Sequence, residues 1–143
     1  MSFLSVVGYG VSVLGMLGLW RNGSLFATHP FLIAIQVAAV GLMIWARITF
    51  GWRSFHLSAN PTAGGLVTNG PYRFIRHPIY TAICLFVVAG LAGHFSAAAA
   101  MLVLLMFFGA NIRIYCEERL LKAHYPDYRV YSARTRRMLP GIY

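Results

Sequence analysis

Four long windows with almost no charge limit what this chain can fold into. They run over residues 3–20, 30–50, 78–93 and 95–113. Arg47 and Arg113 are their only charged residues. Crossing the ~30 Å core of a bilayer takes about 20 apolar residues. Residues 79–112 as one helix would be roughly 51 Å long, too long for one span. The Gly93-His94 break therefore predicts a tight helical hairpin, and the windows together predict about four transmembrane helices.

The composition supports an all-α integral membrane protein with a single domain over residues 1–143. Hydrophobic residues make up 59% of the chain and charged residues 10%, whereas soluble domains carry about 25% charged residues. A net charge of +9 can indicate nucleic-acid binding, but here the arginines lie next to apolar windows. They are typical of topology determinants and of contacts to anionic headgroups, so we expect membrane lipids as partners and no nucleic acid.

Arginine placement predicts the topology. With a cytoplasmic N-terminus, every one of the 12 basic residues except Arg21 lies on the cytoplasmic side, as the positive-inside rule favours. Both termini are therefore predicted to be cytoplasmic. No positive residue precedes Arg21, so the first window is interpreted as a retained span and not a signal peptide. Cys84 and Cys116 form neither a disulfide framework nor a zinc pattern, and no metal site is expected.

Two polar segments flank the predicted hairpin and indicate a site at the membrane–water boundary. In the first, proline disfavours a helical conformation at His77 and suits the first turn of a helix at Pro78. His77 should therefore lie at the entrance of the third span, with its imidazole free to turn toward a pocket, and Tyr80 one turn further in. The alternative is that His77 and Tyr80 are interfacial anchors.

In the second polar segment, Arg113 and Glu117 share one helix face through their i,i+4 spacing. Ionisable residues near a bilayer are costly and are by default functional, although a self-neutralising salt bridge is the alternative. Glu118 should point away from Glu117, toward water or toward an arginine of the loop. Gly64 and Gly65 allow a ligand to approach the backbone closely. No GxGxxG motif follows a strand, so a Rossmann dinucleotide site is not expected.

These motifs resemble those of the isoprenylcysteine carboxyl methyltransferase family, to which the membrane phospholipid methyltransferases are related. The cofactor motif corresponds to Leu66-Val67-Thr68-Asn69-Gly70-Pro71-Tyr72-Arg73 followed by Arg76-His77-Pro78-Ile79-Tyr80. The C-terminal signature corresponds to Arg113 with Glu117-Glu118-Arg119-Leu120-Leu121, then Tyr128, Tyr131 and Leu139-Pro140. The resemblance covers roughly residues 40–140, with both motifs in the expected order. The turn at residues 125–128 is one residue shorter than is common in the family.

The resemblance implies a membrane enzyme that uses S-adenosylmethionine without a Rossmann domain. Its cofactor pocket would lie on the cytoplasmic side, covered by the C-terminal segment, residues 119–143. By motif, the cofactor contacts would be Gly64, Gly65, Leu66, Val67, Tyr72, His77, Pro78, Ile79, Tyr80 and Glu117. Arg113 would orient the acceptor, in the family a carboxylate on a lipidated cysteine, and a lipophilic acceptor would enter laterally from the bilayer.

The chemistry of methyl transfer agrees with these assignments. In-line displacement from a sulfonium requires alignment and exclusion of water, and no covalent nucleophile. A cationic cofactor favours a nearby acid such as Glu117, and an anionic acceptor favours Arg113, so these two are the predicted catalytic residues. Three alternatives stay open: a phospholipid N-methyltransferase, a membrane reductase that uses NADPH, and a non-catalytic membrane scaffold protein.

Overall fold

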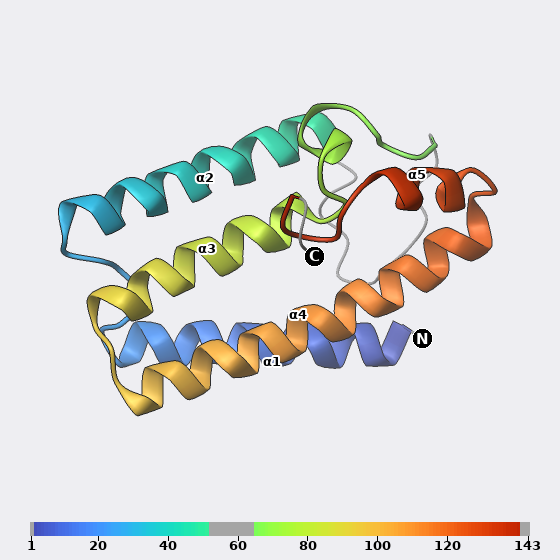
Figure 1. Cartoon of the computed structure of the whole chain (residues 1–143). Helices are drawn as coiled ribbons and strands as arrows, with labels where there is room; N and C mark the ends of the chain where they lie inside the picture. The colour runs from blue at the N-terminus through green and yellow to red at the C-terminus, as the bar shows by residue number, and fades with distance from the viewer. Residues whose placement is uncertain (1, 52–64, 141–143) are drawn as a thin grey trace.

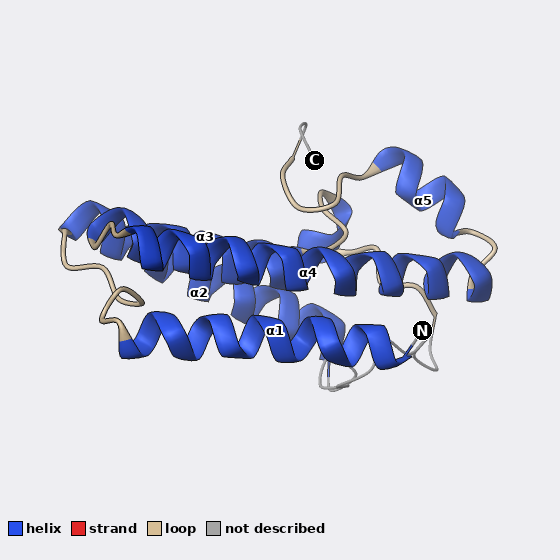
Figure 2. Cartoon of the chain, turned by 90° about the horizontal axis from the view of Figure 1, so that it is seen from below, coloured by secondary structure: helices blue, strands red, loops and turns tan. Residues whose placement is uncertain are grey.

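The computed structural model describes residues 2–51 and 65–140, and these residues form helices and connecting loops (Figures 1 and 2). The α-helices are α1 (Ser2–Arg21), α2 (Pro30–Phe50), α3 (Pro78–Gly93), α4 (Ala97–His124) and α5 (Tyr128–Arg134). A short 3-10 helix, η2 (Gly70–Arg73), precedes α3. The described part contains no strand beyond one isolated parallel bridge between Ile75 and Arg136. The all-α prediction is confirmed.

Local signals in the sequence set the helix boundaries. Proline is the first residue of both α2 and α3, where its missing N–H removes no helical hydrogen bond. His77 precedes α3 with non-helical angles, φ −126° and ψ 57°, which confirms its predicted place outside the helix. Ser96 caps α4, because its side chain accepts a hydrogen bond from the Ala99 N–H at 3.1 Å.

Helices α1, α2, α3 and α4 alternate in direction, so that starts and ends of successive helices gather at one end of the molecule (Figure 1). The start of α1, the end of α2, the start of α3 and the end of α4 all lie toward that end, together with η2 and α5. The opposite end holds the turns between α1 and α2 and between α3 and α4. The two polar segments of the sequence are therefore brought together.

Three of the described helices, α1, α2 and α4, are long and apolar enough to cross a membrane. Helix α3 has 16 residues and would be roughly 24 Å long, shorter than a ~30 Å core. Of the four predicted spans, three are thus matched in length and composition. Many large apolar side chains of these helices face outward, such as Phe3, Leu14, Phe31 and Ile48. Apolar surface of this kind suits hydrocarbon and not water.

The predicted turn of the hairpin is present, but its two limbs pack mainly against other helices. Residues 94–96 join α3 to α4, while the most extensive helix pairs are α1 with α4 and α2 with α3. Small residues contribute to the α1–α4 contact and to a contact of α3 with the loop after α1. A Cβ at Gly90 would lie 2.5 Å from the carbonyl oxygens of Ser24 and Leu25, and one at Gly109 would lie 2.6 Å from the Gly8 carbonyl oxygen. These glycines allow close approach to α1 and to the loop after it, as small residues do in membrane helix packing.

Candidate active site

Four of the predicted site residues meet where α3 begins and the polar part of α4 passes. The Arg113 Nε donates a hydrogen bond to the Tyr80 hydroxyl at 2.7 Å, and that hydroxyl donates to Glu117 Oε1 at 2.6 Å. The direct Arg113 Nε to Glu117 Oε1 distance is 3.4 Å. His77 Nδ1 lies 3.6 Å from the other Glu117 oxygen. The i,i+4 prediction for Arg113 and Glu117 is confirmed, and Tyr80 lies between them.

Exposure differs among these side chains, and the difference decides which of them a ligand can reach. The side chains of His77 and Arg113 are 5% and 9% exposed, whereas that of Glu117 is 22% exposed. Glu117 is therefore the most accessible charged group of this set. The imidazole of His77 is buried beside two carboxylates, so the expectation that it turns freely at the helix entrance is wrong.

A second cluster, Arg76, His77, Glu118 and Arg137, adjoins the first. Glu118 Oε1 accepts from Arg76 Nε at 2.9 Å and lies 3.5 Å from His77 Nε2. Glu118 Oε2 accepts from Arg137 at 3.0 and 3.2 Å. Glu118 is buried, so of the two expectations for it, contact with an arginine of the loop is confirmed and exposure to water is wrong. We name these four residues the Glu118 cluster.

The chain near the C-terminus packs onto the loop that leads into α3. The Arg76 and His77 N–H groups donate to the carbonyls of Arg136 and Arg137 at 2.7 and 2.9 Å. The Thr81 hydroxyl donates to the Met138 carbonyl at 2.8 Å. Residues 136–138 are thereby fixed to the loop and first turn of α3 that contain His77.

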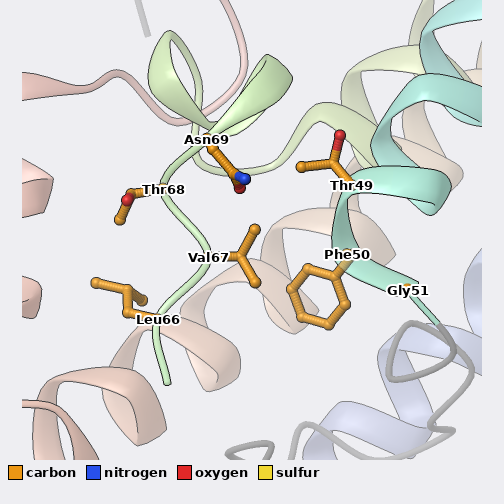
Figure 3. Close-up of a pocket in the computed structure, with 7 residues that line it drawn as sticks. All are labelled: Thr49, Phe50, Gly51, Leu66, Val67, Thr68 and Asn69. Carbon is orange, nitrogen blue, oxygen red and sulfur yellow. The ribbon is translucent and has the colours of Figure 1, made fainter. Parts of the chain in front are cut away.

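A pocket of about 680 Å³ lies between the end of α2 and the extended chain before η2 (Figure 3). Its lining residues are Thr49, Phe50, Gly51, Leu66, Val67, Thr68 and Asn69. Val67 and Asn69 point toward Phe50 and Thr49, while Leu66 and Thr68 point the other way (Figure 3). Of the predicted cofactor contacts, Leu66 and Val67 line this pocket, and Gly64 lies outside the described residues.

The remaining predicted contacts lie along the chain from Gly65 to the first turn of α3. Gly65 is exposed with φ of 87°, a left-handed conformation that favours glycine. Tyr72 is buried, and its ring centroid lies 5.6 Å from that of Phe50 in the pocket wall. Burial, assisted by the charge of Glu117 and by Tyr131, raises the pKa of the Tyr72 phenol well above its ordinary value. Pro78 is buried and Ile79 half-buried in the first turn of α3.

The sequence interpretation missed Arg76, Glu118 and Arg137 as members of one cluster. Arg76 is 42 residues and Arg137 is 19 residues from Glu118 in the sequence, so no helical spacing predicts these contacts. The available signal was the charge balance, since the chain has 3 acidic residues against 12 basic ones and two of the acids are adjacent. Within the described residues, no group of three or more His, Cys, Asp or Glu could hold a metal ion.

The fold and the two clusters define a helical integral membrane protein with a polar site at one end of its helices. The family model of the phospholipid methyltransferases matches residues 25–128, and this chain belongs to that family. The family is one of membrane methyltransferases within the isoprenylcysteine carboxyl methyltransferase-like group. The resemblance inferred from the motifs is therefore confirmed.

Two curated relatives carry names from metal resistance. The cobalt-zinc-cadmium resistance protein CzcN of Cupriavidus metallidurans is 30% identical over 118 residues, which is 79% of this chain and 51% of that protein. The nickel-cobalt-cadmium resistance protein NccN of Alcaligenes xylosoxydans xylosoxydans is 31% identical over 117 residues, or 77% and 53%. This chain thus spans about half the length of the curated relatives that it matches. No solved structure matches the chain.

Proposed function

We propose that this protein is an S-adenosylmethionine-dependent methyltransferase that acts on a lipophilic acceptor, with a carboxylate or other oxygen as the methylated group. It would cross the membrane four times, with both termini and the site on the cytoplasmic side. The observation that carries the proposal is the Arg113–Tyr80–Glu117 arrangement. It holds one cation and one partly exposed anion side by side in a chain of a membrane methyltransferase family.

The residues present fit a nucleoside cofactor with a cationic sulfur. Glu117 offers a reachable carboxylate, and a carboxylate is the natural neighbour of a sulfonium. His77 lies between Glu117 and Glu118, with its Nδ1 3.6 Å and its Nε2 3.5 Å from a carboxylate oxygen, so its imidazole is held at the start of α3 beside the reachable carboxylate. The pocket of about 680 Å³ lies within the usual size range of ligand sites, roughly 300–1,000 Å³.

When bound, the cofactor would supply an electrophilic methyl group. The extended chain at Gly65 to Val67, with Gly64 by motif, would approach the nucleoside through its backbone. Tyr72 and the first turn of α3, from His77 to Tyr80, would enclose it. Glu117 would hold the positive charge in place. These residues would bind and orient the cofactor and exclude water, which is what displacement at a sulfonium requires.

Arg113 would orient the acceptor. A guanidinium recognises a carboxylate through paired N–H groups. The Tyr80 hydroxyl is closer to Arg113 Nε, at 2.7 Å, than the carboxylate of Glu117 is, at 3.4 Å. Tyr80 thereby keeps the arginine and the glutamate from acting only on each other. A lipophilic acceptor would reach this position laterally from the bilayer.

A phospholipid amine is the second candidate acceptor. It is favoured by the description of the matched family, phospholipid methyltransferase. An amine needs a base that removes a proton, and His77 and Glu117 lie 3.6 Å apart, within range of such a role. In this case Arg113 would contact the lipid phosphate and not the methylated group.

Calorimetry on the purified protein tests the cofactor, with S-adenosylhomocysteine and NADPH as separate ligands. We expect S-adenosylhomocysteine to bind and His77→Ala to weaken it. Binding of NADPH alone would favour a reductase, and binding of neither would favour a scaffold protein. Radiolabelled methyl transfer to a prenylcysteine analogue, compared with phosphatidylethanolamine, then decides the acceptor. Transfer only to the amine would overturn the oxygen acceptor.

A further inference from the structure

Glu118 joins three segments that are far apart in the sequence. Its side chain is 4% exposed and stands on α4, five residues beyond Arg113. One of its oxygens faces the loop before α3, through Arg76 at 2.9 Å and His77 at 3.5 Å. The other faces Arg137 at 3.0 Å. Arg137 Nε also donates to the first oxygen at 3.3 Å, so one carboxylate on α4 contacts both the loop and residues 135–138.

Backbone hydrogen bonds between the same two segments run in parallel but are few. They comprise the Arg76 and His77 N–H groups to the carbonyls of Arg136 and Arg137, and the Arg136 N–H to the Phe74 carbonyl at 3.3 Å. A pairing this short is marginally stable on its own, as small isolated sheets are. The Thr81–Met138 hydrogen bond and the burial of Met138 also hold this segment, and the ion pairs of Glu118 add charged contacts to them.

Arg76, in the loop before α3, also binds the chain just before residues 135–138. Its Nη1 donates to the Ser132 carbonyl at 3.0 Å and also to the Thr135 carbonyl. These carbonyls end α5, where a cation also interacts favourably with the helix dipole. Without the carboxylate of Glu118, the buried part of Arg76 and the partly exposed Arg137 would lose the anion that lies between them.

We propose that Glu118 is a positioning residue that holds residues 135–138 closed over the start of α3 and fixes the orientation of His77. The second half of this inference rests on the proposed function, since it assigns His77 to the cofactor. Glu118 does not itself touch the cofactor. It acts through His77, whose Nε2 it faces, while Glu117 faces Nδ1.

The test compares Glu118→Gln, Glu118→Asp and Arg137→Gln in the full-length protein, with Arg136→Gln as the matched control. The Arg136 side chain belongs to the same segment but is exposed. Hydrogen exchange of the His77 and Arg136 amides measures closure. We expect at least about tenfold faster exchange in Glu118→Gln and Arg137→Gln, as the loss of charged hydrogen bonds implies. Glu118→Asp should lie between these and the wild type, and Arg136→Gln should match the wild type.

Binding of S-adenosylhomocysteine separates positioning from closure. Both Glu118→Gln and Arg137→Gln open the segment, but only Glu118→Gln also removes the carboxylate charge 3.5 Å from His77 Nε2. Its Kd should therefore rise several-fold more than that of Arg137→Gln, and Glu118→Asp should restore part of the affinity. Equal Kd values for the two would overturn the positioning role.

Exchange at the wild-type rate in Glu118→Gln would overturn the closure. If Glu118→Gln does not fold, exchange at the wild-type rate in Arg137→Gln would overturn the closure. In that case, wild-type affinity in Glu118→Asp would overturn the positioning role. Failure of the wild type to bind S-adenosylhomocysteine would refute the proposed function and with it the role toward His77. The exchange rates would still decide the closure.

Discussion

The pairing of Arg113 with Glu117 yields the sharpest prediction, because stability reports its structural role and methyl transfer reports its catalytic role in the same set of proteins. The perturbation is a double-mutant cycle with Arg113→Ala and Glu117→Gln. Removing one partner of a buried ion pair costs about 3–5 kcal/mol. Here Glu117 is 22% exposed and keeps the Tyr80 hydroxyl and His77 as neighbours. We therefore expect each single change to lower the free energy of unfolding by about 2 kcal/mol, near or below the lower end of that range.

The coupling energy follows from the distances. Two charges 3.4 Å apart attract by about 5 kcal/mol at an effective dielectric constant of 20, which is an upper bound. The Tyr80 hydroxyl and the solvent at Glu117 reduce this value, so we expect a coupling of about 1–2 kcal/mol, within the usual range for contacting residues. The double mutant should regain that amount, and this part of the cycle is measured by denaturation.

Methyl transfer to a prenylcysteine analogue, followed in the same four proteins, measures the catalytic role. Arg113→Ala should raise the KM of the acceptor and leave S-adenosylhomocysteine binding nearly unchanged. Glu117→Gln should weaken binding of the sulfonium cofactor more than binding of its neutral product. The double mutant should stay inactive even where its stability recovers. Arg119→Ala, an exposed arginine of the same helix, should change neither quantity. Folded single mutants with full turnover would refute the catalytic assignment.

Three further predictions follow from the packing, the phenols and the charges. Gly109→Ala should lower stability by about 1–3 kcal/mol by overpacking, since its Cβ would lie 2.6 Å from a backbone oxygen of α1. Gly41→Ala, where no described atom lies within 4 Å, should not lower it. Burial raises the pKa of Tyr131 from 10.0 to about 12, and the charge of Arg76 opposes this shift. The neutral phenol therefore stabilises the fold below pH 10, and this stabilisation is lost as the pH rises from 10 to about 12. Tyr131→Phe should flatten the decline of the melting temperature in that window, and an unchanged decline would contradict the assignment. A C-terminal reporter that is active only outside the cytoplasm should stay silent, and activity would reverse the proposed topology.

Helix positions were predictable where the boundary depends on local chemistry. The predicted window 30–50 coincides with α2, and the predicted start of the third helix at Pro78 and its end at Gly93 match α3. The fourth window was placed at 95–113, but α4 continues to His124. The length of an apolar window reflects the thickness of the membrane, whereas the helix itself can continue beyond the membrane. The polar residues that follow, such as Glu117 and Lys122, are themselves good helix formers.

The site was predictable only in part, for a related reason. Arg113 and Glu117 are four residues apart on one helix, so their contact follows from local geometry. The contact of Tyr80 with both of them joins two helices, and the sequence motif placed Tyr80 in the site without giving this geometry. Arg137 and Glu118 meet because the chain turns after α4 and runs back along the loop. No periodicity encodes such a return, so only the three-dimensional structure reveals it.

Helix α1 lies wholly outside the matched residues 25–128, yet it contributes to the site through its packing. Gly8 and Gly109 let the backbones of α1 and α4 approach closely, as small residues do between membrane helices. Tyr9 follows Gly8, and its ring centroid lies 5.2 Å from Arg113 Cζ, within the range of a cation–π contact. Arg113 lies four residues after Gly109, so the close crossing sets the position of the ring that covers the arginine. The packing of α1 against α4 therefore determines the orientation of Arg113. A substitution that separates these helices should change the interaction of Arg113 with the proposed acceptor more than the interaction of Glu117 with the proposed cofactor.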